Sequence, residues 1–270
     1  MITNPTSLAQ SQFGVAAADY ATSDVHAKGE SLGRIIELAA PQQSWRALDV
    51  ATGAGHMAAA LAPHVASIVA SDITDPMLAE AAKLAAARNL ANMTTAKAEA
   101  GALPFANESF DLVCCRLAAH HFPDLRRFVG EVRRVLKNGG RFALVDNVAP
   151  DTQQLPKASA AERDDASSAY NAFEKLRDPS HGYAPPPETW IELLEKDGFT
   201  IVAREQFGKE LDFDSWVTRM RCAPATVTEL ERILTEGPPH LRSFLQPRRD
   251  HQGALYFTLQ ELLIVADKTA

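Results

Sequence analysis

The chain has 270 residues, of which 23% are charged and 46% are hydrophobic, and its formal net charge is -7. This excess of acid argues against a nucleic-acid groove or an anionic membrane surface as the main partner. There is neither a long uninterrupted apolar run nor a basic stretch followed by an apolar one, so we expect no membrane insertion and no secretory signal. Three cysteines, two of them adjacent, have neither disulfide nor metal-ligand spacing, so we expect a cytoplasmic protein without a metal.

The first 45 residues predict a helical cap ahead of a larger domain. Apolar residues between Phe13 and Ala40 recur at helical spacing and are interrupted near residues 22–24, which indicates two short helices. Pro41 follows, and because proline cannot continue a helix we expect the second helix to end there.

The stretch from residue 46 to residue 148 alternates strand patterns with helical ones. Thr74-Asp75-Pro76 caps one helix, Asp124 caps another, and Asn138-Gly139-Gly140 predicts a stop for the latter. Such alternation implies right-handed crossovers and a parallel, doubly wound sheet. We expect strands over 46–51, 65–72, 93–98, 110–115 and 141–147, with helices over 56–61, 77–88 and 124–135.

The regular alternation of strand and helix patterns changes after Pro150. The segments 151–186 and 208–252 interrupt the alternation, and we interpret them as candidate lid or substrate-pocket material. We expect helices over 159–176 and 188–196, a sixth strand over 199–207, two or three helices around Trp216 and Leu230, and a closing strand over 254–266.

The segment from Ala47 to His56 is an apolar strand pattern followed by a two-glycine loop at the start of a helix. Such a loop presents N–H groups suited to the polar part of a nucleoside cofactor. Gly53-x-Gly55-x-x-Ala58, with an acid beyond it, also matches the dinucleotide fingerprint, so a nicotinamide cofactor stays open on these residues alone. Asp49 favours S-adenosylmethionine instead, because its carboxylate attracts an ammonium group and repels a pyrophosphate.

Further features point the same way. Asp72 closes the second strand, where a carboxylate can accept both ribose hydroxyls, and Glu99 follows the third strand. Leu103-Pro104-Phe105 and Ser109-Phe110-Asp111 come next, and 136–141 leads into the fifth strand. In this order and spacing, these motifs resemble the class I S-adenosylmethionine-dependent methyltransferases, in the branch similar to ubiquinone/menaquinone-biosynthesis (UbiE-like, Methyltransferase type 11) enzymes.

The resemblance implies an α/β fold, with a Rossmann-like, doubly wound, seven-stranded sheet whose last strand is antiparallel. Helices lie on both faces, and helical insertions follow strands five and six. One structural domain is then divided into an N-terminal helical cap at 1–45, a cofactor-binding core at 46–148, and a completion of the sheet with lid or substrate insertions at 149–270.

The resemblance also implies S-adenosyl-L-methionine as cofactor and S-adenosyl-L-homocysteine as product. The loop glycines would lie against the methionine part, Asp49 would bind the amino group, Asp72 would clamp the ribose, and Glu99 would reach the adenine amine. The implied cofactor-binding residues are Tyr20, Asp49, Ala51, Gly53, Gly55, Asp72, Ile73, Met77, Glu99, Ala100, Arg116 and Leu117.

Two positions depart from the family pattern. Ala51 stands where many members have the first loop glycine, which costs backbone freedom but little volume. Glu99 stands where the family usually has Asp, which lengthens the reach of the carboxylate by one methylene.

His120 and His121, just beyond the fourth strand, are the candidate catalytic residues. Ligands bind at this edge of the sheet in such folds, and imidazole suits proton removal from a phenol, hydroxyl or carbon acid at neutral pH. A packing role is the alternative for either histidine, and many enzymes of this class need no base. His181, Arg177 and Trp216 are candidate substrate residues, again with packing as the alternative.

The chain is therefore predicted to transfer a methyl group from S-adenosylmethionine to a small organic acceptor by in-line displacement. Two alternatives stay open: a nicotinamide-dependent oxidoreductase that uses the same glycine loop, and a methyltransferase-like or cyclase-type scaffold that binds the cofactor without transferring methyl. We expect a small-molecule acceptor as partner, no nucleic acid, and a monomer or homodimer.

Overall fold

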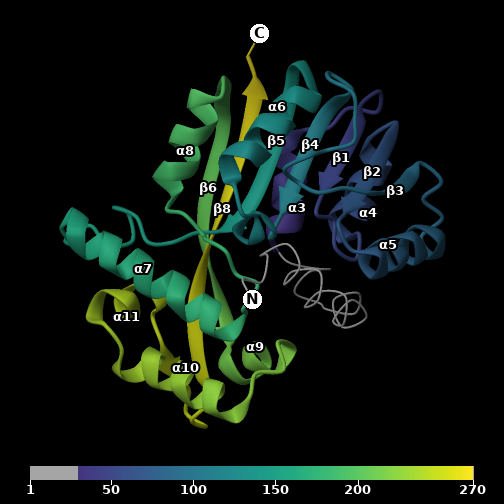
Figure 1. The fold of residues 1–270 in the computed structure, drawn as a ribbon. Helices are drawn as coiled ribbons and strands as arrows, with labels where there is room; N and C mark the ends of the chain where they lie inside the picture. Colours follow the sequence, from purple (N-terminus) through teal and green to yellow (C-terminus); the bar gives the residue numbers. More distant parts are fainter. Residues whose placement is uncertain (1–29, 270) are drawn as a thin grey trace, which may run out of the picture. The chain divides into compact units, whose positions relative to one another are not determined.

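The fold is that of a computed structural model, which describes residues 30–269 (Figure 1). Its described strands form one eight-stranded sheet in the order β3-β2-β1-β4-β5-β8-β6, with β7 paired to β8. The predicted Rossmann-like α/β fold is confirmed, and the short edge strand β7 adds to the seven strands expected. The strands are β1 Arg46–Val50, β2 Ser67–Asp72, β3 Met93–Lys97, β4 Phe110–Arg116, β5 Leu136–Asn147, β6 Phe199–Asp212, β7 Arg248–Arg249 and β8 Leu255–Lys268.

The first five strands are parallel and the last long strand is antiparallel. β1 pairs with β2 and β4, β2 pairs with β3, and β4 pairs with β5, all in parallel register. The ammonium of Lys268, the last residue of β8, donates to the carbonyl of Leu136, the first residue of β5, at 2.7 Å. Thr269, just past β8, donates its N–H to Gly198, just before β6, at 2.9 Å. The start of each neighbour therefore lies beside the end of β8, as expected for an inserted antiparallel strand.

Helices follow the strands as the sequence patterns predict. Thr74 is the N-cap of α5, and Asp124 caps α6 by accepting the N–H of Arg127 at 2.9 Å. Central strands read as continuous apolar runs because helices cover such parallel sheets, and Leu48, Ile68 and Val113 are fully buried. The described helices in and around the sheet are α3 Glu30–Ala39, α4 His56–Leu61, η1 Ala62–His64, α5 Asp75–Ala87, η2 Ala119–His121, α6 Leu125–Val135 and α8 Pro187–Lys196.

The junction between α6 and β5 differs from the prediction. α6 ends at Val135, and Asn138-Gly139-Gly140 lies inside β5 rather than stopping the helix. Leu136 pairs with Phe110, and both are fully buried, so the strand already begins there. Residues 137–140 then bulge opposite Asp111, which holds the Lys137 ammonium at 2.7 Å. The glycines serve this irregularity in the strand, and the predicted helix stop was wrong.

The chain divides into two compact units. Among the described residues, the first contains 30–146, Ile191–Glu205 and 263–269, and the second contains Asn147–Trp190 and Gln206–Leu262. Strands β5, β6 and β8 each contribute residues to both units. The division into segments 1–45, 46–148 and 149–270 stays a prediction.

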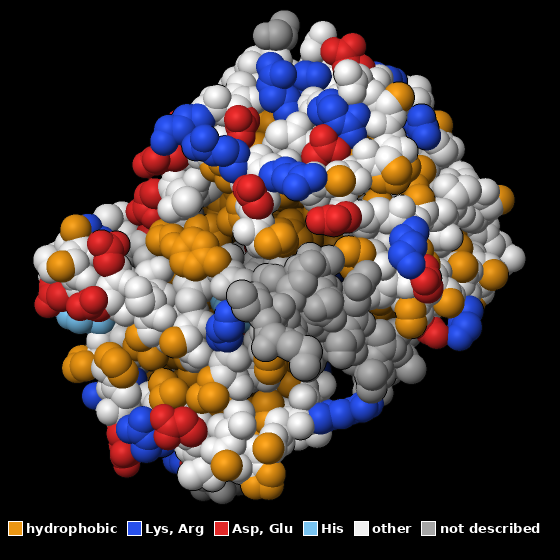
Figure 2. Space-filling view, in the orientation of Figure 1, with side chains coloured by type: hydrophobic (Ala, Val, Ile, Leu, Met, Phe, Trp, Pro, Cys, Tyr) orange, Lys and Arg blue, Asp and Glu red, His pale blue; other side chains and the backbone are white. Residues whose placement is uncertain are grey.

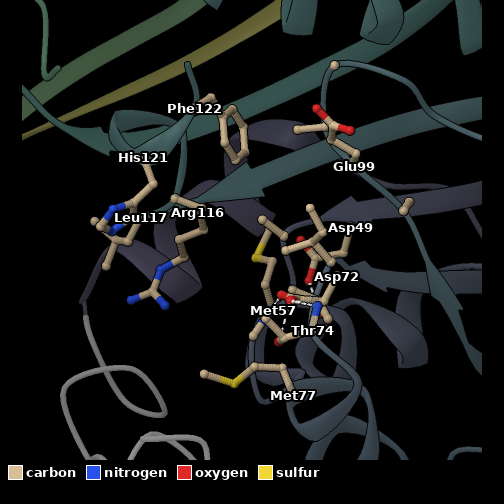
Figure 3. A pocket seen from close by; sticks show the side chains of 18 of the residues that line it. Asp49, Met57, Asp72, Thr74, Met77, Glu99, Arg116, Leu117, His121 and Phe122 are labelled. Atoms are coloured by element: carbon tan, nitrogen blue, oxygen red, sulfur yellow. Dashed lines mark hydrogen bonds between the residues drawn. The ribbon is translucent and has the colours of Figure 1, made fainter. Parts of the chain in front are cut away.

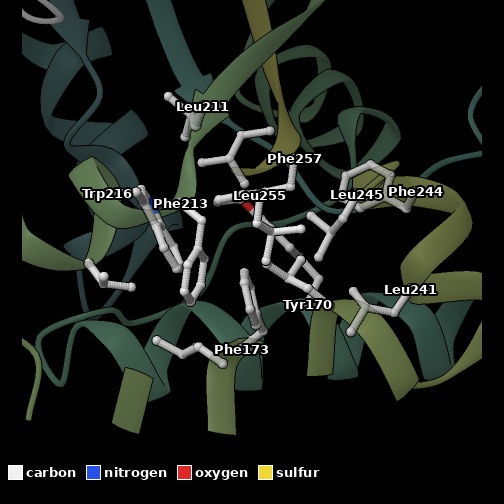
Figure 4. Close-up of a cluster of buried hydrophobic side chains, with 14 of the residues drawn as sticks. Tyr170, Phe173, Leu211, Phe213, Trp216, Leu241, Phe244, Leu245, Leu255 and Phe257 are labelled. Carbon is white, nitrogen blue, oxygen red and sulfur yellow. The ribbon is translucent and has the colours of Figure 1, made fainter. Parts of the chain in front are cut away.

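The second unit has its own aromatic core (Figure 4). Trp216 stacks on Phe173 with ring centroids 5.2 Å apart and meets Phe257 edge-on at 4.8 Å. Such pairs add about 0.5–1.5 kcal/mol beyond the area that they bury. β6 continues to Asp212, five residues past the predicted end, so the expected insertion at 208 starts inside a strand. The helices of this unit are α7 Ala160–Arg177, α9 Phe213–Arg219, α10 Pro224–Glu236 and α11 Pro239–Leu245.

Charged side chains of both signs are interspersed over the face seen in Figure 2. Among residues 30–269, no helix combines the length and the apolar character needed to cross a bilayer. The cytoplasmic location and the monomeric or dimeric state stay predictions.

Candidate active site

A cavity of about 370 Å³ in the first unit lies at the carboxyl ends of the parallel strands (Figure 3). Parallel strands all end at one edge of a sheet, so segments far apart in sequence meet there. Figure 3 shows Met57 and Met77 on one side of the space and Arg116, Leu117 and His121 on the other. The lining residues are Asp49, Ala51–Ala54, His56, Met57, Asp72–Thr74, Met77, Ala98–Gly101, Arg116–Ala118, His121–Asp124 and Arg127.

The glycine loop after β1 is held in a left-handed backbone conformation. Ala51 and Gly53 both have φ of 54°, and Gly55 has φ of 88°. Ala51 carries a Cβ in this region, at a cost of about 1–2 kcal/mol that glycine would avoid. Gly55 does not line the cavity; a Cβ there would lie 2.9 Å from the Ala81 Cβ and 3.1 Å from the Met93 Cε. Gly55 is therefore required by the close packing of α5 and β3 against this loop.

Asp49 is a buried acid with three donors around it. Its Oδ2 accepts the hydroxyl of Thr52 at 2.6 Å and the N–H of Ala58 at 3.1 Å, and the Cys114 thiol lies 3.5 Å from Oδ1. Burial raises the pKa of Asp49 to about 6, although these hydrogen bonds lower it in part. At neutral pH the carboxylate is charged, and a cationic ligand group beside it would be strongly attracted.

Asp72, at the end of β2, ties the glycine loop to the following turn. Its Oδ2 accepts the N–H of Gly53 at 3.0 Å, and its Oδ1 accepts the N–H and the hydroxyl of Thr74 at 2.9 and 2.8 Å. Burial raises the pKa of Asp72, and the bonds from Thr74 and Gly53 act in the opposite direction. Asp72 thus shapes the cavity wall and also faces the cavity.

The segment beyond β4 contributes a cation and a strained turn. Arg116 is the last residue of β4, and its Nε and Nη2 both lie 3.3 Å from the Ser31 hydroxyl on α3. Leu117 has φ of 54° and donates its N–H to Val145 at 2.8 Å. A branched side chain in this conformation is uncommon and often marks a functional turn.

The two histidines, which the sequence treats alike, occupy different places. His121 lines the cavity, and His120 does not. His120 is 9% exposed and contacts Asp146, on β5, at two points: ring Nδ1 to Oδ1 at 2.5 Å and backbone N–H to Oδ2 at 2.8 Å. The two imidazole centroids are 4.1 Å apart. Asp146 therefore holds His120, and the His120 ring lies against the histidine that faces the cavity.

The three predicted substrate residues belong to the second unit and make contacts within it. Arg177 donates from Nε and Nη2 to the Trp216 carbonyl at 3.1 Å, and its guanidinium lies 4.5 Å from the Trp216 ring centroid. Trp216 is 1% exposed in the aromatic core. His181 Nε2 lies 2.9 Å from the Asn171 Oδ1. Their local contacts are those of packing, and their role in substrate binding stays a prediction.

Of the predicted cofactor residues, Tyr20 lies outside the described residues, and all others except Gly55 line the cavity. Sequence reasoning missed other lining residues, among them Thr52, Met57, Thr74, Phe122, His56 and Arg127. The first five lie within a few residues of positions already singled out, so the rule that ligands bind at strand ends could have found them. Asp146 lies 26 residues from His120, and no local pattern links the two.

The chain is similar to several proteins that are named as methyltransferases. A family model described as "Methyltransferase domain" matches residues 48–144. The "Uncharacterized methyltransferase YcgJ" of Bacillus subtilis (strain 168) is 34% identical over 210 residues, which is 78% of this chain and 79% of the relative. The solved structure of the Bacillus subtilis YcgJ protein superposes with a TM-score of 0.78 at 30% identity, covering 89% of this chain and 98% of that one. The fold and these relatives together identify the chain as a methyltransferase.

The branch follows from relatives named demethylmenaquinone methyltransferase. The one of Clavibacter sepedonicus is 30% identical over 172 residues, covering 60% of this chain and 69% of the relative. Demethylmenaquinone methyltransferase of Thermus thermophilus is 37% identical over 119 residues, covering 43% of this chain and 54% of that one. This chain belongs to the class I S-adenosylmethionine-dependent methyltransferases, in the UbiE-like branch.

Proposed function

We propose that the chain transfers the methyl group of S-adenosyl-L-methionine to a small organic acceptor by in-line displacement and releases S-adenosyl-L-homocysteine. The observation that carries this proposal is the pair of buried carboxylates, Asp49 and Asp72, facing one cavity across the Gly53 loop. The charge of Asp49 suits an ammonium group and opposes the pyrophosphate of a dinucleotide at the same loop.

The residues around the cavity fit this cofactor. A volume of about 370 Å³ lies within the range of small-molecule sites. Asp49 would hold the amino group and Asp72 the ribose hydroxyls, while the Arg116 guanidinium suits a carboxylate. Met77 and Ile73 supply apolar surface for the adenine beside Asp72.

The protein's contribution is alignment and exclusion of water. Thr52 and the N–H of Ala58 hold the Asp49 carboxylate, so its position is set before a ligand arrives. Leu117 and Phe122 line the wall beside His121 and would exclude water around an acceptor. When bound, the cofactor supplies an electrophilic methyl group on a sulfonium.

His121 lines the cavity and would take a proton from an acceptor bound there. Imidazole accepts protons near neutral pH, which suits an acceptor that attacks through a phenol, hydroxyl or acidic carbon. Demethylmenaquinone methyltransferase is the name of one relative, and a small organic acceptor is the corresponding proposal for this chain.

Binding and product release test the proposal separately. Titration calorimetry with S-adenosylmethionine, S-adenosylhomocysteine and NADH should show binding of the first two only. Incubation with S-adenosylmethionine and a small-molecule extract of bacterial cells should then release S-adenosylhomocysteine, measured by mass spectrometry against heat-inactivated protein. Binding of NADH alone would favour the oxidoreductase, and cofactor binding without product release from any extract would favour the non-methylating scaffold.

A further inference from the structure

One face of α6 carries three charged residues, Arg127, Glu131 and Arg134, at spacings of four and three. Residues at these spacings lie on the same side of a helix. Together they bind backbone groups of the segment that follows β3, and this set of residues is called the α6 clamp below.

The first contact of the α6 clamp is at the cavity. Arg127 Nε donates to the Gly101 carbonyl at 2.7 Å. The Arg127 side chain also packs over this glycine, since a Cβ on Gly101 would lie 3.3 Å from the Arg127 Cδ. Arg127 and Gly101 both line the cavity, so the contact forms part of its wall.

The second contact holds both backbone polar groups of Leu103, its N–H and its carbonyl. Glu131 Oε2 accepts the Leu103 N–H at 2.7 Å, and Arg134 Nη2 donates to the Leu103 carbonyl at 2.8 Å. Arg134 Nη1 reaches on to the Phe105 carbonyl at 2.7 Å. The two side chains also pair with each other, Nε to Oε1 at 2.7 Å and Nη2 to Oε2 at 2.8 Å. An ion pair thus satisfies backbone groups that a neighbouring strand would satisfy in a sheet.

These contacts matter because the segment between β3 and β4 has little regular structure to hold it. Glu99 and Ala102 form one isolated bridge, and no helix or longer strand lies between Lys97 and Phe110. Glu99, Ala100 and Gly101 line the cavity. Their position therefore depends on how the next residues are attached to α6.

We propose that the α6 clamp positions Glu99–Gly101 and thereby sets the selectivity of the cavity for the base of its nucleoside ligand. This inference rests on the proposed binding of S-adenosylmethionine, in which this segment reaches the adenine. Arg127, Glu131 and Arg134 are then positioning residues that act through the loop backbone. The charged hydrogen bonds are shorter and stronger than neutral ones, which suits a part of the wall that must keep its place.

Calorimetry with two probes separates this role from general support of the fold. S-adenosylhomocysteine carries the adenine amine, and S-inosylhomocysteine carries an oxo group in its place. The wild-type protein should prefer the former. Arg134→Lys keeps the positive charge but loses the planar guanidinium that binds several acceptors at once. In this variant and in Arg127→Ala, S-adenosylhomocysteine should bind about tenfold more weakly, while the affinity for S-inosylhomocysteine should change little.

Arg126→Ala is the matched control, because this exposed arginine lies beside Arg127 on the same helix turn. It should leave both affinities unchanged. The positioning role would be overturned if the clamp variants kept the wild-type ratio of the two affinities, or if the wild type bound both probes equally well. Absence of S-adenosylhomocysteine binding to the wild type would instead refute the proposed function, so the two failures are distinguishable.

Discussion

Buried polar side chains are used differently in the two units. In the first unit, Asp49 and Asp72 are buried and also border the cavity, so part of their surroundings is open to a ligand. In the second unit, Glu261 is 1% exposed and pairs with Lys209 at 2.9 Å, while His181 meets Asn171. Burial of a polar group therefore does not by itself mark a site. A group that borders a cavity can also interact with a ligand.

The largest expected effect comes from the aromatic core of the second unit. Trp216→Ala should lower the free energy of unfolding by about 3–5 kcal/mol, because the indole stacks on Phe173 and supports the Arg177 guanidinium. Urea unfolding followed by circular dichroism would measure it, with Trp216→Phe as the milder control. A variant as stable as the wild type would contradict the packing role of Trp216.

The next effect concerns the cavity wall in the first unit. Asp72→Ala should weaken S-adenosylmethionine binding by about tenfold or more, since it removes a ligand acceptor and releases the Gly53 N–H. Asp72→Asn keeps one acceptor oxygen and should lose less. Calorimetry on both variants measures the difference; equal affinities in the wild type and the alanine variant would refute the ribose-clamp assignment.

Because binding depends on the charge of Asp49, the affinity for the cofactor should fall at acidic pH. Its pKa is raised to about 6, so lowering the pH below 6 protonates the carboxylate and removes the attraction for an ammonium group. The affinity should fall by up to about tenfold per pH unit below that value. Binding titrations from pH 8 to pH 5 should show this fall in affinity in the wild type and a much smaller pH dependence in Asp49→Asn.

The same shift predicts the opposite trend for stability without ligand. The folded-state pKa of Asp49 lies above its ordinary value of 3.8, so the folded protein binds the proton more tightly than the unfolded chain. The contribution of Asp49 to stability is therefore lost as the pH rises from about 4 through about 6. Asp49→Asn should consequently be at least as stable as the wild type at pH 7, and a marked loss of stability would show that the carboxylate is needed to hold Thr52 and Ala58.

The smallest effect on cofactor affinity is expected at His121. His121→Ala should change S-adenosylmethionine affinity by less than about twofold while lowering turnover with any acceptor found in the extract. His120→Ala is the contrast, because it leaves the buried Asp146 carboxylate without its ring partner and should destabilise the fold. Unchanged turnover in both variants would rule out a substrate-side role for either histidine.

Most of the fold and much of the cavity could be predicted, because both depend on local patterns. The α4 bounds, His56–Leu61, agree with the prediction, and the caps at Thr74 and Asp124 are confirmed. Parallel strands then bring their carboxyl ends together, so strand-end residues such as Asp49 and Asp72 could be assigned to one edge without knowing any contact.

The failures have a common physical cause. β5 starts at Leu136 because that residue pairs with Phe110, far earlier in the chain, and a helix-stop signal in the glycines cannot report such a pairing. Strand registers and side-chain partners of this kind depend on which segments meet in space.

By itself, the sequence determined the α/β class, the glycine loop, and the two acids that end strands at the ligand edge, since hydrophobic periodicity and strand-end chemistry are properties of neighbouring residues. Only the tertiary structure showed that Gly55 packs against Ala81 and that Arg134 binds the Leu103 backbone. It also showed that His120 contacts Asp146 while His121 lines the cavity. These contacts link residues about 26 to 31 positions apart, and folding alone brings them within reach of one another.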